Sequence, residues 1–434
     1  MAGSNAMSLK FKAMKKKYTF RKFINDVHLW LGLPSAIILV VMCFTGTLYV
    51  FQKEITQWVD RDKYTIEAGG RYLAIADLTT KVETEKKGTV TSIQIPQLAN
   101  EAWTFNVAKK GNAESKTEKP TLTKDSKKNK ELAGSTPKKD KDKSYWVNPY
   151  NGKVISDAQT PTSEFFATVL KLHRWLLIEN HDIGGAITGT AALMMLLLQI
   201  TGIILWAPAK LKSWKKFNVW EPGFKIKFDA KFKRVNFDAH KALGFYAFLF
   251  VTIMAITGPY FAFNWYKTSF ASLMGTKPVS KEISDQSVRP GAGSQRIDLE
   301  TVLKNVRTEY PYAGTTRITF PKDSAGVFAV QKYASGFIAS SAVDKMTLDQ
   351  YSGKKVGATR FDQKTLGEKI IASAKLLHTG ELFGTFSKIL YFLACLIATS
   401  LPITGFLIWW GKNNKTEKTV SPARKQRPVI KVTA

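Results

Sequence analysis

Five histidines are the residues of this 434-residue chain best suited to hold a metal or cofactor, and four of them follow a repeated pattern. His28 and His240 each precede a glycine by four residues and a Thr-Gly pair by 17 and 18 residues. Residues four apart lie on one face of a helix, one turn from each other. The first glycines are Gly32 and Gly244, and the second glycines are Gly46 and Gly258.

The other two histidines of the pattern each follow a leucine and precede an apolar block. His173 lies before the block that ends with Thr-Gly202, and His378 lies before the block that ends with Thr-Gly405. The chain is therefore a tandem duplication in which each half reads helix, long connection, helix. Bundling the helices brings His28 together with His240 at one membrane face and His173 together with His378 at the other.

Two histidines that face each other across a helix bundle can bind the iron of a b-type haem from its two sides, without covalent attachment. The glycines leave space for the flat ring: Gly46 and Gly258 lie about 27 Å along their helices, towards the outer pair. Gly202 and Gly405 lie at the level of the inner pair. We therefore predict two haem b groups. Small residues also pack membrane helices without any cofactor, and that alternative stays open for these positions.

Other metals fit the pattern less well, because no carboxylate or cysteine joins the histidines at zinc or copper spacing. His181 has no counterpart in the second half, and we expect it to be structural or substrate-facing. The two cysteines, Cys43 and Cys395, each lie inside an apolar block. Because the chain has only these two cysteines, a disulfide scaffold, an iron–sulfur site and a Cys-x-x-Cys-His haem attachment are excluded. Arg174, with Lys171, Arg21 and Arg234, is a candidate to pair with haem propionates, although interfacial snorkelling explains these residues equally well.

The elements that position these residues are four apolar blocks of 22 to 25 residues, each long enough to cross a bilayer. The chain carries 64 Lys and Arg against 34 Asp and Glu, but the basic residues lie between and outside the apolar blocks. That distribution indicates a membrane protein and argues against a nucleic-acid partner. The fold class is a membrane α-helical four-helix bundle with two extracytoplasmic α+β domains.

Basic residues also predict the orientation. The segment Lys10–Lys22 before the first apolar block carries seven basic residues and no acid, and the segment 208–238 carries nine basic residues against three acids. Both chain ends and this segment should be cytoplasmic. We expect a cytoplasmic tail at 1–24, beginning with a tag remnant, membrane helices at 25–58, 166–207, 239–266 and 371–410, extracytoplasmic domains at 59–165 and 267–370, a cytoplasmic loop at 208–238 and a cytoplasmic tail at 411–434.

The two long connections should each form a small unit with antiparallel hairpins. Alternating runs lie at 91–96, 102–108, 145–149, 317–320 and 326–331, and a helix is expected at 299–310. The stretch 109–143 carries 12 lysines and six acids and should be a disordered insert. The short cytoplasmic parts cannot hold a flavin or nucleotide domain.

These motifs resemble the PepSY-associated transmembrane family. The resemblance is carried by His28-x3-Gly32 with Thr-Gly46, Leu-His173-Arg-Trp-Leu-Leu, His240-x3-Gly244 with Thr-Gly258, and Leu-His378-Thr-Gly-Glu-Leu-Phe-Gly384. The Tyr-x-Gly-Lys turns of the connections look like PepSY modules. The family includes iron-regulated inner-membrane proteins and ferric-siderophore reductases of the FoxB type, which hold b haems.

The resemblance implies that His28 with His240, and His173 with His378, are the haem ligands. It also implies reduction of a ferric siderophore or other ferric chelate in the periplasm, by a protein of the bacterial inner membrane. The electron donor would be membrane quinol or a cytosolic flavoprotein. A different hypothesis is a non-redox, membrane-anchored binding or regulatory protein that inhibits peptidases or senses the envelope. The apolar blocks contain no Asp or Glu, which argues against a proton-coupled or cation-coupled transporter.

Overall fold

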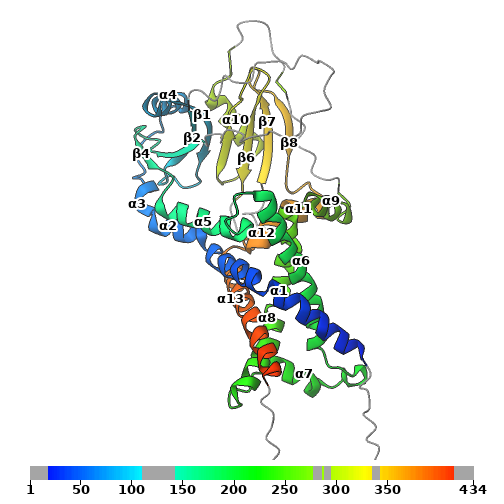
Figure 1. Cartoon of the computed structure of the whole chain (residues 1–434). Helices are drawn as coiled ribbons and strands as arrows, with labels where there is room; N and C mark the ends of the chain where they lie inside the picture. Colours follow the sequence, from blue (N-terminus) through cyan, green and yellow to red (C-terminus); the bar gives the residue numbers. More distant parts are fainter. Residues whose placement is uncertain (1–17, 110–141, 277–285, 288–294, 335–342, 415–434) are drawn as a thin grey trace, which may run out of the picture.

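The computed structural model describes residues 18–109, 142–276, 286–287, 295–334 and 343–414. Among these residues, four helices are long and apolar enough to cross a membrane, as the sequence predicts. They are α1 (Phe20–Tyr49), α6 (His181–Trp206), α8 (Phe232–Ala262) and α13 (Gly384–Asn413). Figure 1 shows them below a large β-sheet.

The four long helices pack around a core of small residues. Helices α1 and α8 each contact both α6 and α13. Ala191, Ala247, Ala255, Ala394 and Ala398 are buried at the centre. Small side chains let helix backbones approach closely, which is how membrane helices gain packing energy when lipid is as apolar as the side chains.

A layer of shorter helices separates the sheet from the long helices (Figure 1). In the first half it contains α2 (Gln52–Val59), α3 (Arg61–Tyr64) and α5 (Pro161–Trp175). In the second half it contains α9 (Asn264–Leu273), α11 (Leu366–Ala372) and α12 (Ala374–Thr379). At the opposite end of the bundle, η1 (Leu211–Ser213) and α7 (Phe217–Phe224) connect α6 to α8.

This layer corrects the predicted bounds of the membrane helices. The segment 166–207 is not one helix, because Leu176 and Leu177 adopt the left-handed conformation and separate α5 from α6. The segment 371–410 is broken in the same place, at the left-handed Gly380 between α12 and α13. The first helix ends at Tyr49, and most of the residues predicted to extend it to 58 belong to α2. The third begins at Phe232 instead of 239 and ends at Ala262 instead of 266.

The five predicted strands and three that were not predicted, β4, β7 and β8, form one continuous antiparallel sheet, in the order β4-β3-β2-β1-β5-β6-β7-β8. Helices α4 (Ile75–Lys86) and α10 (Leu299–Glu309) pack against it and share its buried core. The strands are β1 (Gly88–Ile95), β2 (Trp103–Lys109), β3 (Lys143–Val147), β4 (Val154–Asp157), β5 (Thr316–Thr319), β6 (Val327–Tyr333), β7 (Val343–Asp349) and β8 (Lys355–Thr359).

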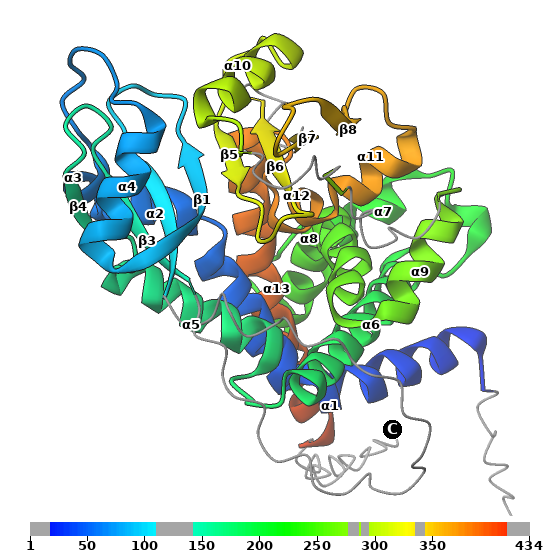
Figure 2. The same ribbon diagram turned by 90° about the horizontal axis from the view of Figure 1, so that it is seen from above.

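Two separate α+β domains were expected, but strands β1 and β5 join the two halves edge to edge, as Figure 2 shows from above. The two strands are equivalent in the repeat, since they read Thr-x-Ile-x-Ile-Pro at 91–96 and Thr-x-Ile-x-Phe-Pro at 316–321. Ile93 pairs with its own counterpart, Ile318, and both are fully buried. Pairing removes two exposed strand edges, which would otherwise be open to other chains. Most of the predicted insert 109–143, and the tag remnant, lie outside the described residues.

Candidate cofactor sites

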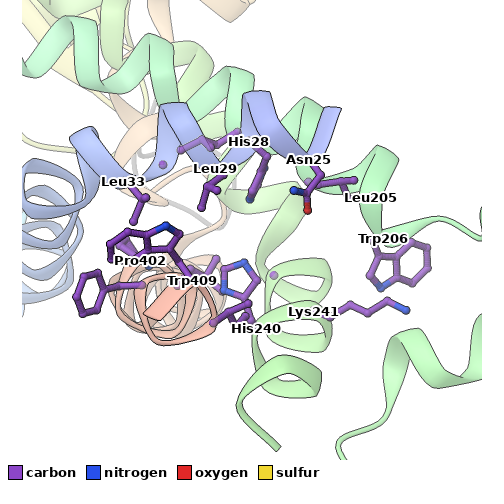
Figure 3. Close-up of a pocket in the computed structure, with 18 of the residues that line it drawn as sticks. Asn25, His28, Leu29, Leu33, Leu205, Trp206, His240, Lys241, Pro402 and Trp409 are labelled. Atoms are coloured by element: carbon purple, nitrogen blue, oxygen red, sulfur yellow. The ribbon is translucent and has the colours of Figure 1, made fainter. Parts of the chain in front are cut away.

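The structure brings His28 and His240 together at the end of the bundle far from the sheet. His28 comes from α1 and His240 from the equivalent turn of α8. Their ring centroids lie 6.4 Å apart, and the ring planes are nearly perpendicular at 87°. Figure 3 shows the two rings pointing towards each other across the space between the helices. We call His28 and His240 the sheet-distal pair.

The second pair lies at the other end of the bundle, beneath the sheet. His173 comes from α5 and His378 from α12, the short helices that precede α6 and α13. The ring centroids are 6.2 Å apart and the planes make an angle of 61°. We call His173 and His378 the sheet-proximal pair. These histidines were expected at the entrances of the membrane helices, but the chain turns back between each histidine and its long helix.

Each of the four histidines has the same hydrogen-bond partner, the threonine of a Thr-Gly pair on a neighbouring helix. The contacts join Nδ1 of His28 to Oγ1 of Thr201 (2.8 Å), His240 to Thr404 (2.8 Å), His173 to Thr45 (3.1 Å) and His378 to Thr257 (2.9 Å). Two independent repeats therefore build the same contact at both levels.

These threonines favour one histidine tautomer. A hydroxyl has one hydrogen, and each threonine directs it to a carbonyl of its own helix, as Thr201 does to Leu197 (2.9 Å) and Thr45 does to Val41 (2.7 Å). The hydroxyl oxygen must then accept from Nδ1–H of the histidine. We therefore assign the proton to Nδ1, which leaves the lone pair of Nε2 available to a metal ion. Nδ1 of His173 also lies 2.9 Å from the carbonyl oxygen of Met42, a second acceptor for the same proton.

The spacing of the rings fits a metal ion held between them. A metal–imidazole bond is about 2 Å long and the ring centre lies roughly 1 Å beyond the nitrogen, so two rings on opposite sides of one ion have centroids roughly 6 Å apart. The measured separations are 6.4 Å and 6.2 Å. Among the described residues there is no group of three or more His, Cys, Asp or Glu side chains that could hold a metal ion. Two imidazoles at the measured spacing could hold a metal whose other ligands come from a cofactor such as haem.

A cavity of about 610 Å³ surrounds the sheet-distal pair. Four predicted glycines line it: Gly32, Gly244, Gly202 and Gly405. A Cβ atom at Gly32 would meet only Leu198, at 3.6 Å, and a Cβ atom at Gly244 only Leu401, at 3.8 Å. These positions border open space, and a side chain there would project into the cavity. Gly202 and Gly405 instead lie against the two histidines. A Cβ atom at Gly202 would be 3.5 Å from Cε1 of His28, and one at Gly405 would be 3.4 Å from Cε1 of His240.

The remaining predicted glycines lie at the sheet-proximal pair, as their spacing indicates. A Cβ atom at Gly46 would be 3.5 Å from Cε1 of His173, and one at Gly258 would be 3.7 Å from Cε1 of His378. Every histidine thus lies on the Thr-Gly pair of a neighbouring helix. The threonine orients the ring, and the glycine lets the ring approach that helix.

Burial keeps the sheet-proximal histidines neutral. Burial, followed by the charge of the neighbouring His173, lowers the pKa of His378 to about 4, and burial also lowers the pKa of His173. A histidine whose pKa lies below 6.5 is mostly uncharged at pH 7. Only the uncharged imidazole has the free lone pair that a metal requires.

The predicted cationic partners of a cofactor are mostly engaged elsewhere. The guanidinium of Arg174 stacks over the ring of Trp175 at 4.5 Å. Arg234 forms an ion pair with Asp238 (2.8 Å). Arg21 lines the cavity but donates to backbone carbonyls at the end of α6. The propionate role suggested for these three arginines therefore lacks support from their contacts.

His181 belongs to neither of the two histidine pairs. It is exposed at the start of α6, and its ring stacks on Trp175 with centroids 4.0 Å apart. The threonines were not among the predicted site residues. Their signal was present in the Thr-Gly pairs at 45–46, 201–202, 257–258 and 404–405, but only the glycines were given a role.

Fold and site together define a helical membrane protein with a duplicated bundle and two sites of paired histidines. The sequence matches the family described as the PepSY-associated TM region over residues 26–412. This match covers most of the chain and all eight residues of the His–Thr contacts, and the protein belongs to that family. No curated protein matches the chain significantly.

Proposed function

We propose that this protein is an electron-transfer protein of the bacterial inner membrane that holds two b-type haems and reduces a ferric chelate, most simply a ferric siderophore, on the periplasmic side. The sheet and the sheet-proximal pair would face the periplasm, and both chain ends the cytoplasm. The basic segment 208–238 at the other end of the bundle supports this orientation.

The observation that carries the proposal is the pairing of four histidines with Nδ1 bound to threonine and Nε2 free, at separations of 6.4 and 6.2 Å. A haem at each level would supply a one-electron carrier whose iron alternates between the ferric and ferrous states. The histidines would bind the iron, the threonines would hold the rings in place, and the apolar bundle would exclude water.

The two levels lie at opposite ends of the same helices. His28 and Gly46, which contacts His173, are 18 residues apart on α1, or about 27 Å of helix. This span crosses most of the hydrocarbon core, which is about 30 Å thick. An arrangement of this kind suits movement of electrons from one side of the membrane to the other.

Ferric chelates are suitable acceptors because the reaction needs one electron and no proton or group transfer. Each electron taken from the donor, a quinol or a flavoprotein, would reduce one Fe(III) to Fe(II). Fe(II) binds hard oxygen ligands less tightly, so the chelate would release it. Exposed basic residues beside the sheet-proximal pair, Lys171 and Arg174, would favour an anionic chelate.

The test is a reduced-minus-oxidised absorption spectrum of the detergent-purified protein, with a pyridine haemochromogen count. We expect two haem b per chain. In the oxidised protein, the mutual angle of the imidazole planes sets the anisotropy of the low-spin ferric signal. Electron paramagnetic resonance should therefore resolve two species, the more anisotropic one from the pair at 87°. Stopped-flow mixing of the reduced protein with a ferric chelate should reoxidise both haems.

Protein without haem, purified from cells supplied with haem, would refute the proposal. One haem would mean that one histidine pair is not a ligand pair. Two haems that ferric chelates do not reoxidise would retain the electron-transfer function and exclude this acceptor.

The threonine contacts give a second prediction. Replacing Thr201 with valine keeps the side-chain shape but removes the acceptor for Nδ1–H of His28. We expect haem affinity at the sheet-distal pair to fall about 10- to 100-fold, the usual effect of losing a hydrogen bond that orients a metal ligand. Haem loss to excess apomyoglobin measures this. Thr201→Ser keeps the hydroxyl and should retain haem at nearly the wild-type rate; equal loss from both variants would contradict the assigned role.

A further inference from the structure

The charged residues that line the cavity around the sheet-distal pair are all cationic. They are Arg21, Lys241 and Lys412, and no Asp or Glu among the described residues lines the same cavity. A cation that is partly removed from water without an acidic partner is costly. Arg21 and Lys241 are partly buried in this way, whereas Lys412 is exposed. An occupant that brings negative charge to this end of the cavity would offset that cost.

Arg21 already has partners. Its Nη1 donates to the carbonyl oxygen of Ala207 at 3.0 Å, and its Nη2 donates to that of Leu205. The equivalent residue of the second half, Lys233, donates in the same way to the carbonyl oxygen of Gly411 at the end of α13. Both residues precede their histidines by seven positions and cap the end of the neighbouring helix. Arg21 is thus a structural residue of the repeat.

Lys241 and Lys412 differ from Arg21. No hydrogen bond or ion pair ties either ammonium group to another of the residues that the structure describes. Lys241 directly follows His240 on α8 and is partly buried. In Figure 3 it lies on the same side of the histidine pair as Asn25 and Trp206. Lys412 lies on α13, seven residues beyond Gly405, which is about 10 Å along the helix.

The opposite end of the cavity is apolar. Leu39, Met195 and Leu198 line it there, and Leu39 is 3% exposed. Asp238, near Lys241, is itself paired with Arg234 at 2.8 Å. The cavity thus joins an apolar interior, a pair of imidazoles that could bind a metal, and two ammonium groups without a hydrogen bond to another described residue. Haem has the complementary pattern, since its ring is apolar and two propionate carboxylates lie at one edge.

We propose that Lys241 and Lys412 bind the propionates of the haem at the sheet-distal pair and thereby set which way round it lies in the cavity. This inference rests on the proposed function. At this pair it replaces Arg21 and Arg234, which the sequence suggested, because their groups are engaged in other contacts. The alternative for each lysine is that its ammonium only reaches the lipid headgroups.

The test removes charge first from the two lysines and then from the haem propionates. Lys241→Gln, Lys412→Gln and the double variant are compared with the wild type for the rate of haem loss to apomyoglobin. The haem at the sheet-distal pair is identified by its more anisotropic resonance signal. We expect each substitution to increase the rate at which this haem is lost about three- to tenfold, the effect of one charge-assisted hydrogen bond. The haem at the sheet-proximal pair serves as the internal reference. Lys212→Gln, an exposed lysine at the same end of the bundle, is the matched control and should change nothing.

In the second arm, protein purified without haem is reconstituted with haem or with its dimethyl ester, which has no propionate charge. The wild type should prefer haem at the sheet-distal pair, and the double variant should lose that preference. Lys241→Arg keeps the positive charge and should retain haem, which separates charge loss from misfolding. The inference would be overturned if the wild type holds two haems and the lysine variants behave as it does. The variants would then retain haem and discriminate against the ester to the same extent as the wild type. Wild-type protein without haem would instead overturn the proposed function.

Discussion

Replacing His28 with alanine is expected to lower the haem content from two per chain to one and to abolish ferric-chelate reduction. The remaining ring, His240, is held by Thr404 at 2.8 Å but has no partner on the other side of the metal. Bis-imidazole ligation needs both rings, and no other histidine among the described residues lines the cavity. His173→Ala should remove the other haem in the same way.

Two features make this prediction sharp. The resonance signals identify which haem is lost, since His28→Ala should remove the more anisotropic species and His173→Ala the other. His181→Ala is the matched control, because His181 is exposed, stacks on Trp175 and belongs to neither pair. If His181→Ala removes a haem, or if His28→Ala and His173→Ala remove the same one, the pairing of the ligands is wrong.

Replacing Glu54 with glutamine is expected to destabilise the protein by about 1–3 kcal/mol, independently of any cofactor. Its partner is Lys388 on α13, which is 4% exposed although it is a lysine. Nζ of Lys388 lies 2.7 and 2.9 Å from the carboxylate oxygens of Glu54. Removal of that carboxylate leaves a buried ammonium whose other acidic neighbour, Glu381, is 3.8 Å away. The effect is smaller than for a fully buried pair because the Glu54 side chain is 42% exposed.

Unfolding in detergent measures the loss, and a double-mutant cycle isolates its cause. Lys388→Met combined with Glu54→Gln should be more stable than Glu54→Gln alone, because no buried charge remains unpaired. Glu309→Gln provides the comparison: its partner Lys355 is 48% exposed, and loss of such a pair costs about 1 kcal/mol or less. Equal losses from Glu54→Gln and Glu309→Gln would show that the burial of Lys388 does not matter.

The site was predictable because its residues repeat at fixed spacings along helices. A helix converts a spacing of 18 residues into a fixed length, so His28 and Gly46 could be placed at opposite ends of α1 from the sequence alone. The strands were predictable for a related reason: runs such as 102–108 alternate apolar and polar residues, and β2 covers nearly the same positions.

Two features were not predictable from such patterns. The break between α5 and α6 lies at Leu176 and Leu177, although leucine favours a helix. The left-handed turn there depends on the packing of Trp175 against Gly184. A Cβ atom at Gly184 would clash with the carbonyl oxygen of Trp175 at 2.5 Å. The seam between β1 and β5 joins residues more than 200 positions apart, and no local pattern encodes which strand edge meets which.

The symmetric seam has a consequence for the ancestry of the chain. Ile93 pairs antiparallel with its own counterpart, Ile318, as two identical strands would across a two-fold axis. Each histidine pair likewise takes one member from each half. A single half would present one imidazole at each level and one bare strand edge, and would be complete only against a copy of itself. The ancestor before gene duplication would thus have been an obligate homodimer, and fusion later allowed the two subunits to diverge, as the unmatched His181 illustrates.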